Sequence, residues 1–324
     1  MGNSKESILS DLYRQFESSV EVRKYKRAFR LFIKSLKYSL FYFVKTIFNR
    51  RSRYFNFIKE ILYRFRYRLP MIYRQKSQKN VVPVVISLTS YPARFSTLHI
   101  CLKSLLQQSL RPTKVVLYLD NYVHLREVPR KVRRLQKFGL EIRPVGENLK
   151  PHTKYYYAMH DFSCDALITV DDDQIYPKDM LYSLYNSYLK YPHCISARRV
   201  MKIVRDENGI AMPSNSWIGE CSSILSPSMD LLAQGVGGVL YPPSIFDLSS
   251  SCFDKECIRN NCHNADDMWL KFIEVKEGVP VVWCPNKLIF HAIHYENRLM
   301  NTNVLEGEND NQIIKCEKVF GFKL

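Results

Sequence analysis

The chain has 324 residues, of which 46% are hydrophobic and 24% charged, and its formal net charge is +17 at pH 7. This length suits one large α/β domain with an appendage, or two modest domains, and the composition is that of a globular protein, not a disordered or fibrous one. The charge is uneven: residues 1–80 hold 20 Lys and Arg against 5 Asp and Glu, whereas residues 81–324 hold 28 against 26. The basic character therefore belongs to the N-terminal segment.

Within residues 1–80, aromatic and aliphatic side chains are interleaved with basic ones. Lys34, Lys37 and Lys45 interrupt the most apolar part, and each central charge costs about 2.5–3.5 kcal/mol in a membrane span, which argues against spanning. The pattern predicts amphipathic helices lying on a lipid surface. A nucleic-acid arm and a helical appendage packed on its own domain or on a partner are the alternatives. Residues 74–80 are polar and without periodicity, which predicts a linker.

Nine cysteines at irregular spacing, with a polar start and no cleavable signal pattern, predict free thiols in a reducing compartment. Cys252, Cys257 and Cys262, followed by His263, form one loose cluster. Zinc ligands usually come in pairs two to four residues apart, so we expect thiols here and not a zinc site.

From residue 81 the chain alternates between short β-rich runs and helical patterns. The predicted strands are residues 81–88, 115–119, 140–144, 166–170 and 279–284. The predicted helices are about a dozen residues after Phe95, then residues 128–138, 152–162 and 179–191, and finally a helix capped by Asn264. This β-α-β alternation predicts a parallel sheet with helices on both faces.

The apolar run of residues 166–170 leads directly into Asp171, Asp172 and Asp173. Such a run is typical of a buried strand in a parallel sheet, and ligands bind at the carboxyl edge of such sheets. Three adjacent carboxylates repel one another, and a divalent cation shared with a diphosphate would offset that repulsion. The alternative is a solvated acidic turn before the helix that begins near Pro177.

Two later stretches carry further candidate residues. Residues 235–243 contain three glycines, which permit close backbone approach to a ligand. Asp266 and Asp267 open a predicted helix, where the alternative to a chemical role is simple compensation of the helix dipole.

Four sequence runs, in this order, resemble GT-A glycosyltransferases of the inverting, family-two-like group, and within it bacterial enzymes of capsule and lipopolysaccharide assembly. The runs are residues 87–92, 169–173, 235–243 and 265–269. The resemblance extends from residue 81 to the C-terminus. It implies a GT-A fold, which is Rossmann-like with a mostly parallel sheet, as a catalytic domain at residues 81–324 behind the basic segment 1–80.

The resemblance also implies roles for individual residues. For metal binding, with Mn²⁺ or Mg²⁺ as the cofactor, they are Asp171, Asp173, His291 and His294, Asp173 being the more direct ligand. For donor binding they are Thr89, Tyr91, Asp120, Lys154, Asp171 and Asp172. For acceptor binding they are Gly237, Gly238, Asp266 and Trp269. Asp267 matches the general base, which would deprotonate the acceptor hydroxyl. Asp266 stands where the family usually has Glu.

The function implied is metal-dependent transfer from a nucleotide sugar, with UDP as the expected nucleotide, to a saccharide that is free or lipid-linked. The expected location is cytoplasmic, on the inner face of the cell membrane, with no nucleic-acid partner. An aspartate-nucleophile phosphohydrolase of the haloacid dehalogenase type is one alternative, with Asp171 attacking phosphorus. Its motif normally opens the domain, however, whereas about ninety residues of α/β pattern precede this one. A non-enzymatic basic binding module is the other alternative, and it leaves the carboxylate clusters without a role.

Overall fold

The computed structural model describes residues 80–120, 126–163, 165–285 and 308–324, all within a compact unit that spans Leu62–Leu324. The basic helices and the linker predicted for residues 1–80 lie outside the described residues, apart from Asn80. No helix in the described part combines the length and the apolar character needed to cross a bilayer.

A seven-stranded sheet in the order β3-β2-β1-β4-β8-β5-β9 organises this unit. Its strands are β1 (Val81–Thr89), β2 (Arg111–Asp120), β3 (Leu140–Val145), β4 (Ala166–Thr169), β5 (Ile195–Ala197), β8 (Val239–Tyr241) and β9 (Val281–Trp283). Neighbours pair in parallel except at β8, which runs antiparallel to both β4 and β5. The predicted α/β class with a mostly parallel sheet is confirmed.

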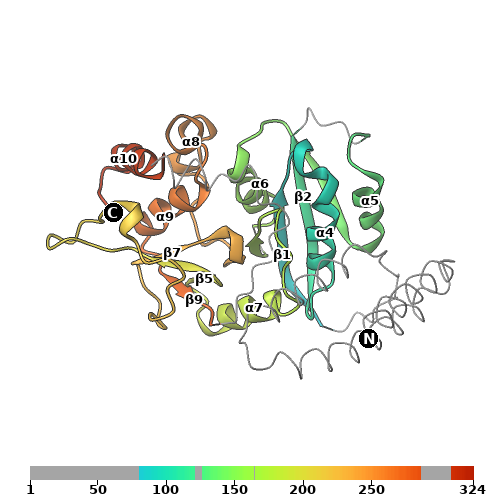
Figure 1. Ribbon diagram of the computed structural model, residues 1–324, viewed down its shortest axis with the longest axis horizontal. Coiled ribbons are helices and arrows are strands. Elements are labelled where there is room, and N and C mark those ends of the chain that lie inside the picture. Colours follow the sequence, from blue (N-terminus) through green and yellow to red (C-terminus); the bar gives the residue numbers. More distant parts are fainter. Residues whose placement is uncertain (1–79, 121–125, 164, 286–307) are drawn as a thin grey trace, which may run out of the picture. The chain divides into compact units, whose positions relative to one another are not determined.

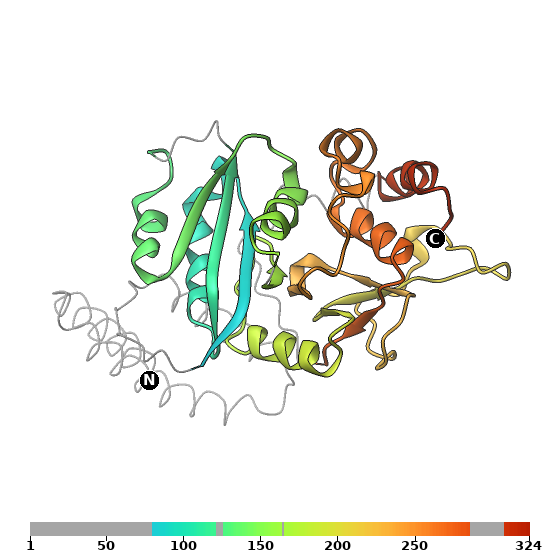
Figure 2. The same ribbon diagram turned by 180° about the vertical axis from the view of Figure 1, so that it is seen from behind.

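Helices cover both faces of the sheet, as the alternating pattern predicted (Figures 1 and 2). They are α4 (Phe95–Leu106), α5 (Arg130–Arg133), α6 (Thr153–Asp161), α7 (Met180–Lys190), α8 (Lys255–Cys262), α9 (Asp266–Lys276) and α10 (Glu308–Phe320). Side chains alternate across each strand, so Val84, Ile86 and Leu88 of β1 join the core with α4, α5 and α7, whereas Val85 joins the core with α6 and α9.

Several element boundaries differ from the prediction. The helix expected at residues 128–138 is the short α5 followed by a 3₁₀ helix (Arg134–Phe138), which ends where Gly139 adopts a left-handed φ of 102°. Strand β9 is shorter than expected, and it follows Pro280, which has no N–H to donate. Ala265, not Asn264, is the N-cap of α9, and no side chain caps the helix there; the backbone N–H of Asn264 donates to the Gln312 side chain.

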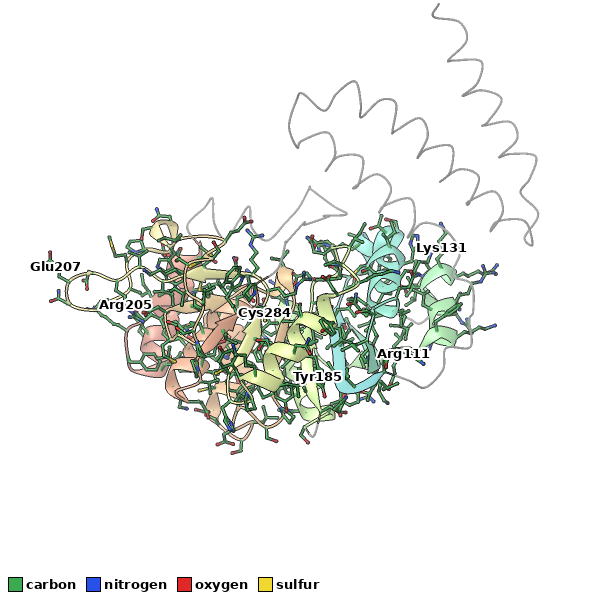
Figure 3. All side chains as sticks on the ribbon, turned by 90° about the horizontal axis from the view of Figure 1, so that it is seen from below. Arg111, Lys131, Tyr185, Arg205, Glu207 and Cys284 are labelled. Atoms are coloured by element: carbon green, nitrogen blue, oxygen red, sulfur yellow. The ribbon has the colours of Figure 1, made fainter. Side chains whose placement is uncertain are left out.

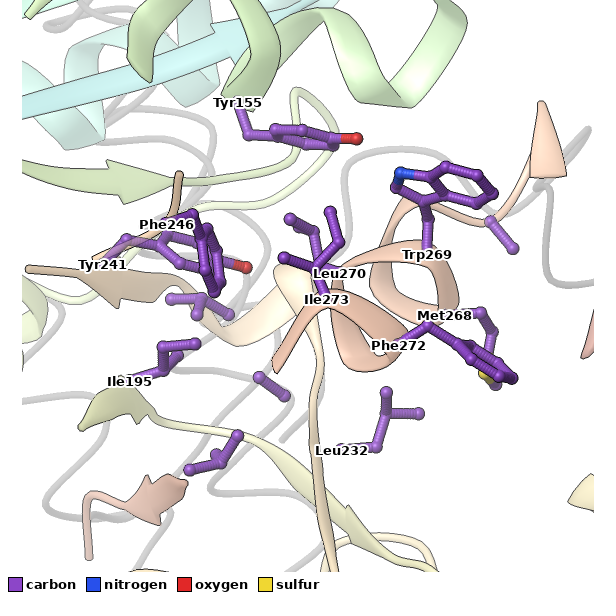
Figure 4. Close-up of a cluster of buried hydrophobic side chains, with 14 of the residues drawn as sticks. Tyr155, Ile195, Leu232, Tyr241, Phe246, Met268, Trp269, Leu270, Phe272 and Ile273 are labelled. Atoms are coloured by element: carbon purple, nitrogen blue, oxygen red, sulfur yellow. The ribbon is translucent and has the colours of Figure 1, made fainter. Parts of the chain in front are cut away.

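A second part of the unit packs β5, β8, β9 and a two-stranded sheet, β6 (Val200–Lys202) with β7 (Leu231–Ala233), against α8, α9 and α10. Figure 4 shows the hydrophobic core where β5, β7, β8 and α9 meet. Helices α8 and α10 were not predicted from the sequence. Figure 3 shows Arg205 and Glu207 on a loop that projects from this part.

Helix α9 is fixed by an ion pair that lies entirely within the core. The Lys271 Nζ donates to Glu274 Oε2 at 3.1 Å and to the backbone oxygen of Leu231 at 2.9 Å. Both charged side chains are almost fully buried, at 0% and 2% exposure. Burial raises the pKa of Glu274 to about 7, although the Lys271 charge opposes the shift. The pair ties α9 to β7 and thereby sets the direction in which its first turn points.

We predict that Gly237→Ala destabilises the fold. A Cβ at residue 237 would lie 2.9 Å from both the backbone N and the Cβ of Arg199, too close for any real contact. Since Arg199 is itself held by the bond from the Gln234 N–H to its carbonyl, the overpacking should cost about 1–3 kcal/mol in the free energy of unfolding, measured in urea. Gly219→Ala is the control, because nothing lies within 4 Å of its added Cβ. Equal stability of the two variants would contradict the prediction.

Candidate active site

The strand directions gather the candidate residues at one edge of the sheet. β1, β2 and β4 run in parallel and end there, and β8 begins there because it runs the opposite way. The register pairs Thr169 with Val239, so the glycine run of residues 235–238 arrives beside the acidic triplet. The first turn of α9 supplies Asp266 and Asp267 to the same place.

Each carboxylate of the triplet is held by a basic or polar side chain. Asp171 Oδ1 lies 2.8 Å from the Lys154 Nζ. Asp172 accepts hydrogen bonds from the Ser90 hydroxyl at 2.5 Å and from the Arg94 guanidinium, and Asp173 lies 3.1 Å from the same guanidinium. Asp172 and Asp173 are both 7% exposed, whereas the side chain of Asp171 is 32% exposed.

Lys154 joins the triplet to α9. Its Nζ also lies 2.9 Å from Asp266 Oδ2, and the residue is only 4% exposed. The neighbouring Asp267 accepts the backbone N–H of Gly235 at 3.1 Å. A Cβ at Gly235 would lie 3.0 Å from the Lys154 Nζ and 3.4 Å from oxygens of both Asp171 and Asp267, so a side chain here would crowd all three groups. The two acidic sites, far apart in sequence, thus form one cluster.

The cluster holds more negative than positive charge among the described residues. Its members are the carboxylates of Asp171, Asp172, Asp173, Asp266 and Asp267 and the cations of Arg94 and Lys154. Burial and the charge of Asp266 raise the pKa of Asp267 well above its usual range. Burial also raises the pKa of Asp171 and of Asp172, against the opposing charges of Lys154 and Arg94. For Asp266, burial acts in the same direction, but Lys154 outweighs it and the pKa is lowered.

These residues fit a hard divalent cation. Carboxylate oxygens are the ligands that Mg²⁺ and Mn²⁺ prefer, and the raised pKa values mark a site that gains from added positive charge. The buried Gln174 Oε1, next to Asp173, has no hydrogen-bond partner within the described part of the chain. Among the described residues, no group of three or more His, Cys, Asp or Glu side chains is arranged to hold a metal ion.

The expected nucleotide-binding residues lie along the ends of β1 and β2. The Thr89 hydroxyl donates to the backbone oxygen of Tyr118, so it joins the two strands. Tyr91 is 44% exposed, and its ring lies 5.4 Å from the Arg94 guanidinium carbon. Asp120 ends β2 at the same edge. Their contacts to a donor stay predictions.

Several residues lie in surroundings that differ from those expected for their predicted roles. Trp269, expected to contact the acceptor, lies in the hydrophobic core (Figure 4). It is 0% exposed, its Nε1 donates to the backbone oxygen of Cys252, and its ring packs on Phe320. That prediction is wrong, because a fully buried indole cannot contact a sugar. Packing alone explains why residues 237 and 238 are glycines. Residue 237 faces Arg199 closely, and residue 238 has a φ of 87° and faces Met180. Their acceptor contacts stay predictions.

His291 and His294 lie outside the described residues, so their metal-binding role also stays a prediction. The cluster also contains Ser90, Arg94 and Gly235, to which the sequence analysis assigned no individual role. A signal existed for Ser90, which directly follows β1, and for Gly235, which opens the glycine-rich run, whereas none marked Arg94.

His152 is a buried, neutral residue that helps to hold this cluster in place. The backbone oxygen of Cys262 can only accept, so the histidine Nε2 carries the proton and donates to it at 2.6 Å, and the Nδ1 accepts from the Tyr155 hydroxyl at 2.9 Å. Burial lowers the pKa of His152 to about 4. The neutral ring therefore ties α6 to α8 and holds the start of α9 near Lys154.

Comparison with known proteins gives a family match. Residues 84–234 match the family described as Glycosyl transferase family 2. No curated protein matches the chain. Two similar solved structures are TarS residues 1–349 of S. aureus and the mannosyltransferase PcManGT of Pyrobaculum calidifontis, the latter in complex with GDP-Man and Mn²⁺.

Both structures are 12% identical to the chain. The TarS match covers 72% of this chain and 64% of that one, with a TM-score of 0.41. The chain therefore spans less than two thirds of the TarS structure. The PcManGT match covers 83% and 74%, with a TM-score of 0.44.

Proposed function

We propose that this chain, which is a family-two-like GT-A glycosyltransferase, transfers a sugar from a UDP-sugar to a saccharide hydroxyl with inversion at the anomeric carbon and with a divalent cation bound. The observation that carries the proposal is the Lys154 bridge. It unites Asp171, on the donor side, with Asp266, beside Asp267, in one partly buried cluster. Inverting transfer needs these two carboxylate sites together, one for the departing diphosphate and one for the acceptor.

On the donor side, Asp171 and Asp173 would hold Mn²⁺ or Mg²⁺, with His291 or His294 as a further ligand. When bound, the cation supplies Lewis-acid stabilisation of the diphosphate leaving group. Thr89, Tyr91 and Asp120 would line the nucleotide. Lys154, which the sequence suggested for phosphate contact, is already engaged by two carboxylates, so its charge acts on the donor from within the cluster.

On the acceptor side, Asp267 would take the proton of the attacking hydroxyl. The Gly235 N–H fixes the carboxylate, and the missing side chain lets this backbone pack closely against Lys154, Asp171 and Asp267. Asp266 is held by Lys154 and keeps its charge, which makes the neighbouring Asp267 a stronger base. A raised pKa makes the ionised carboxylate a stronger proton acceptor, as the general-base role requires.

We predict that UDP binds tightly only with Mg²⁺ or Mn²⁺ present. Calorimetry should show UDP affinity collapsing in EDTA and in Asp173→Ala, because the diphosphate charge is then left facing the acidic triplet. Asp247→Ala, which removes an exposed carboxylate elsewhere, should bind as the wild type does. Equal UDP affinity with and without metal would refute the metal-dependent site.

We predict that Asp267→Asn binds donor normally but turns over about 10²–10⁴-fold more slowly, since asparagine keeps the shape and the Gly235 contact and cannot accept a proton. The assay is release of nucleotide from a panel of nucleotide sugars with Mn²⁺. Proton NMR of the product should show an inverted anomer. Wild-type turnover in the variant would remove Asp267 from the role, and release of inorganic phosphate alone would favour the phosphohydrolase.

We propose further that the acceptor is a growing, lipid-linked saccharide of a bacterial surface polysaccharide, and that residues 1–80 hold the enzyme on the anionic inner face of the membrane. The support is the concentration of basic and aromatic residues in that segment, beside a catalytic part near neutrality. A charge excess that served solubility alone would be spread over the whole surface.

The full chain should therefore co-sediment with phosphatidylglycerol vesicles, less so as salt rises. Each Lys near such a surface contributes about 1 kcal/mol, so changing Lys34, Lys37 and Lys45 to Gln should weaken binding by about two orders of magnitude. The matched control changes three exposed lysines of the described part, Lys137, Lys190 and Lys323. Equal loss in both triple variants would show that net charge, and not the segment, is responsible.

A further inference from the structure

Arg94 occupies a central place at the donor edge that no sequence pattern assigned. It is the last residue of a 3₁₀ turn (Pro92–Arg94) and the N-cap of α4, and its side chain is 15% exposed. Its Nε donates to the Tyr91 hydroxyl at 3.2 Å, and its Nη1 reaches both Asp172 and Asp173. One guanidinium therefore connects the nucleotide side of the site with the acidic triplet.

The two aspartates hold this guanidinium differently. Asp172 has both oxygens engaged, Oδ2 by the Ser90 hydroxyl and Oδ1 by Arg94, and the pair lies within hydrogen-bonding distance. Asp173 makes a looser contact, with 3.1 Å between its Oδ2 and the Arg94 Nη1, while its Oδ1 accepts from the Gln174 side chain. Asp172 thus anchors Arg94, and Asp173 is the partner that Arg94 can release.

We infer that Arg94 is a resident counter-ion of the triplet, which weakens binding of a divalent cation alone and makes that binding depend on the nucleotide diphosphate. The inference rests on the proposed function. A cation held by Asp173 would stand beside the guanidinium and be repelled, since like charges a few ångströms apart in a partly buried site interact strongly. The diphosphate of the donor brings negative charge that attracts both the cation and the Arg94 guanidinium. Arg94 then turns from Asp173 to the diphosphate, while Asp172 and Tyr91 keep the guanidinium in place.

The inference assigns Arg94 as a positioning residue with a distinctive signature. A merely structural arginine would weaken every ligand when removed. A resident counter-ion does the reverse for the metal: its loss leaves the triplet more negative and strengthens binding of the bare cation, while the donor loses a charged partner.

The test is titration of Mn²⁺ alone, followed by electron paramagnetic resonance of the free ion, with the full-length wild type, Arg94→Gln and Arg94→Lys. We expect Arg94→Gln to bind Mn²⁺ alone at least about tenfold more tightly, and Arg94→Lys, which keeps the charge, to stay close to the wild type. UDP affinity at saturating Mn²⁺ should fall about tenfold in Arg94→Gln and recover in Arg94→Lys, as expected for one charge-assisted hydrogen bond. Arg133→Gln, an exposed position on α5, controls for the change in net charge.

The outcomes separate this inference from the function on which it rests. Unchanged or weaker Mn²⁺ binding by folded Arg94→Gln overturns the counter-ion role, as does failure of both wild type and variant to bind Mn²⁺ alone. If either result is obtained with an enzyme that still releases nucleotide from its donor in the presence of metal, the proposed function stands and only the role of Arg94 is lost. Circular dichroism establishes that the variants are folded before the titrations are compared.

Discussion

The Lys154 ammonium contacts carboxylates from two distant parts of the chain, Asp171 after β4 and Asp266 at the start of α9, and the site depends on this contact. A buried ammonium is stable only when its charge is matched, and so are the buried carboxylates around it. The same residue also ties α6 to β1, because the backbone oxygen of Lys154 accepts a hydrogen bond from the Ser87 hydroxyl. These contacts hold α6, the ends of the strands and α9 in one arrangement. If Asp171 or Asp266 moved away, the Lys154 ammonium would lose one of its two charged partners.

The reversed strand β8 makes that arrangement possible. In a wholly parallel sheet the segment before each strand lies at the amino edge, away from the ligand-binding edge. Because β8 runs antiparallel to β4 and β5, the residues before it, Gly235 to Gly238, reach the carboxyl edge instead. The backbone N–H of Gly235 can then meet Asp267, and the glycines allow the close packing against Lys154, Arg199 and Met180. This one reversed strand of three residues therefore brings the glycine segment into contact with both the acidic triplet and Asp267.

The sequence predicted those features that depend on local pattern. Apolar β-rich runs bounded by polar residues located β1, β2, β3 and β4, and the position of the aspartates after β4 located the site edge. What could not be predicted depends on contacts between remote segments. Trp269 follows an acidic pair just as a ligand-binding residue would, and only the packing of Phe320 and the carbonyl of Cys252 bury it. Likewise, Lys154 carries no mark in the sequence that distinguishes a phosphate ligand from an ammonium paired with Asp266.

The buried pair of Lys271 and Glu274 in α9 has an evolutionary consequence. Loss of Glu274 leaves the Lys271 charge unpaired in the core, and loss of Lys271 leaves a buried carboxyl without its partner; breaking such a buried pair typically costs about 3–5 kcal/mol, whereas replacement of both by apolar residues is often neutral. Each single substitution therefore destabilises the protein strongly, although the double substitution does not. In descendants of this chain the two positions should be inherited as a unit, either kept together or exchanged together. The direction of α9, which carries Asp266 and Asp267, would then be preserved over long divergence, even while the exposed residues of the same helix change.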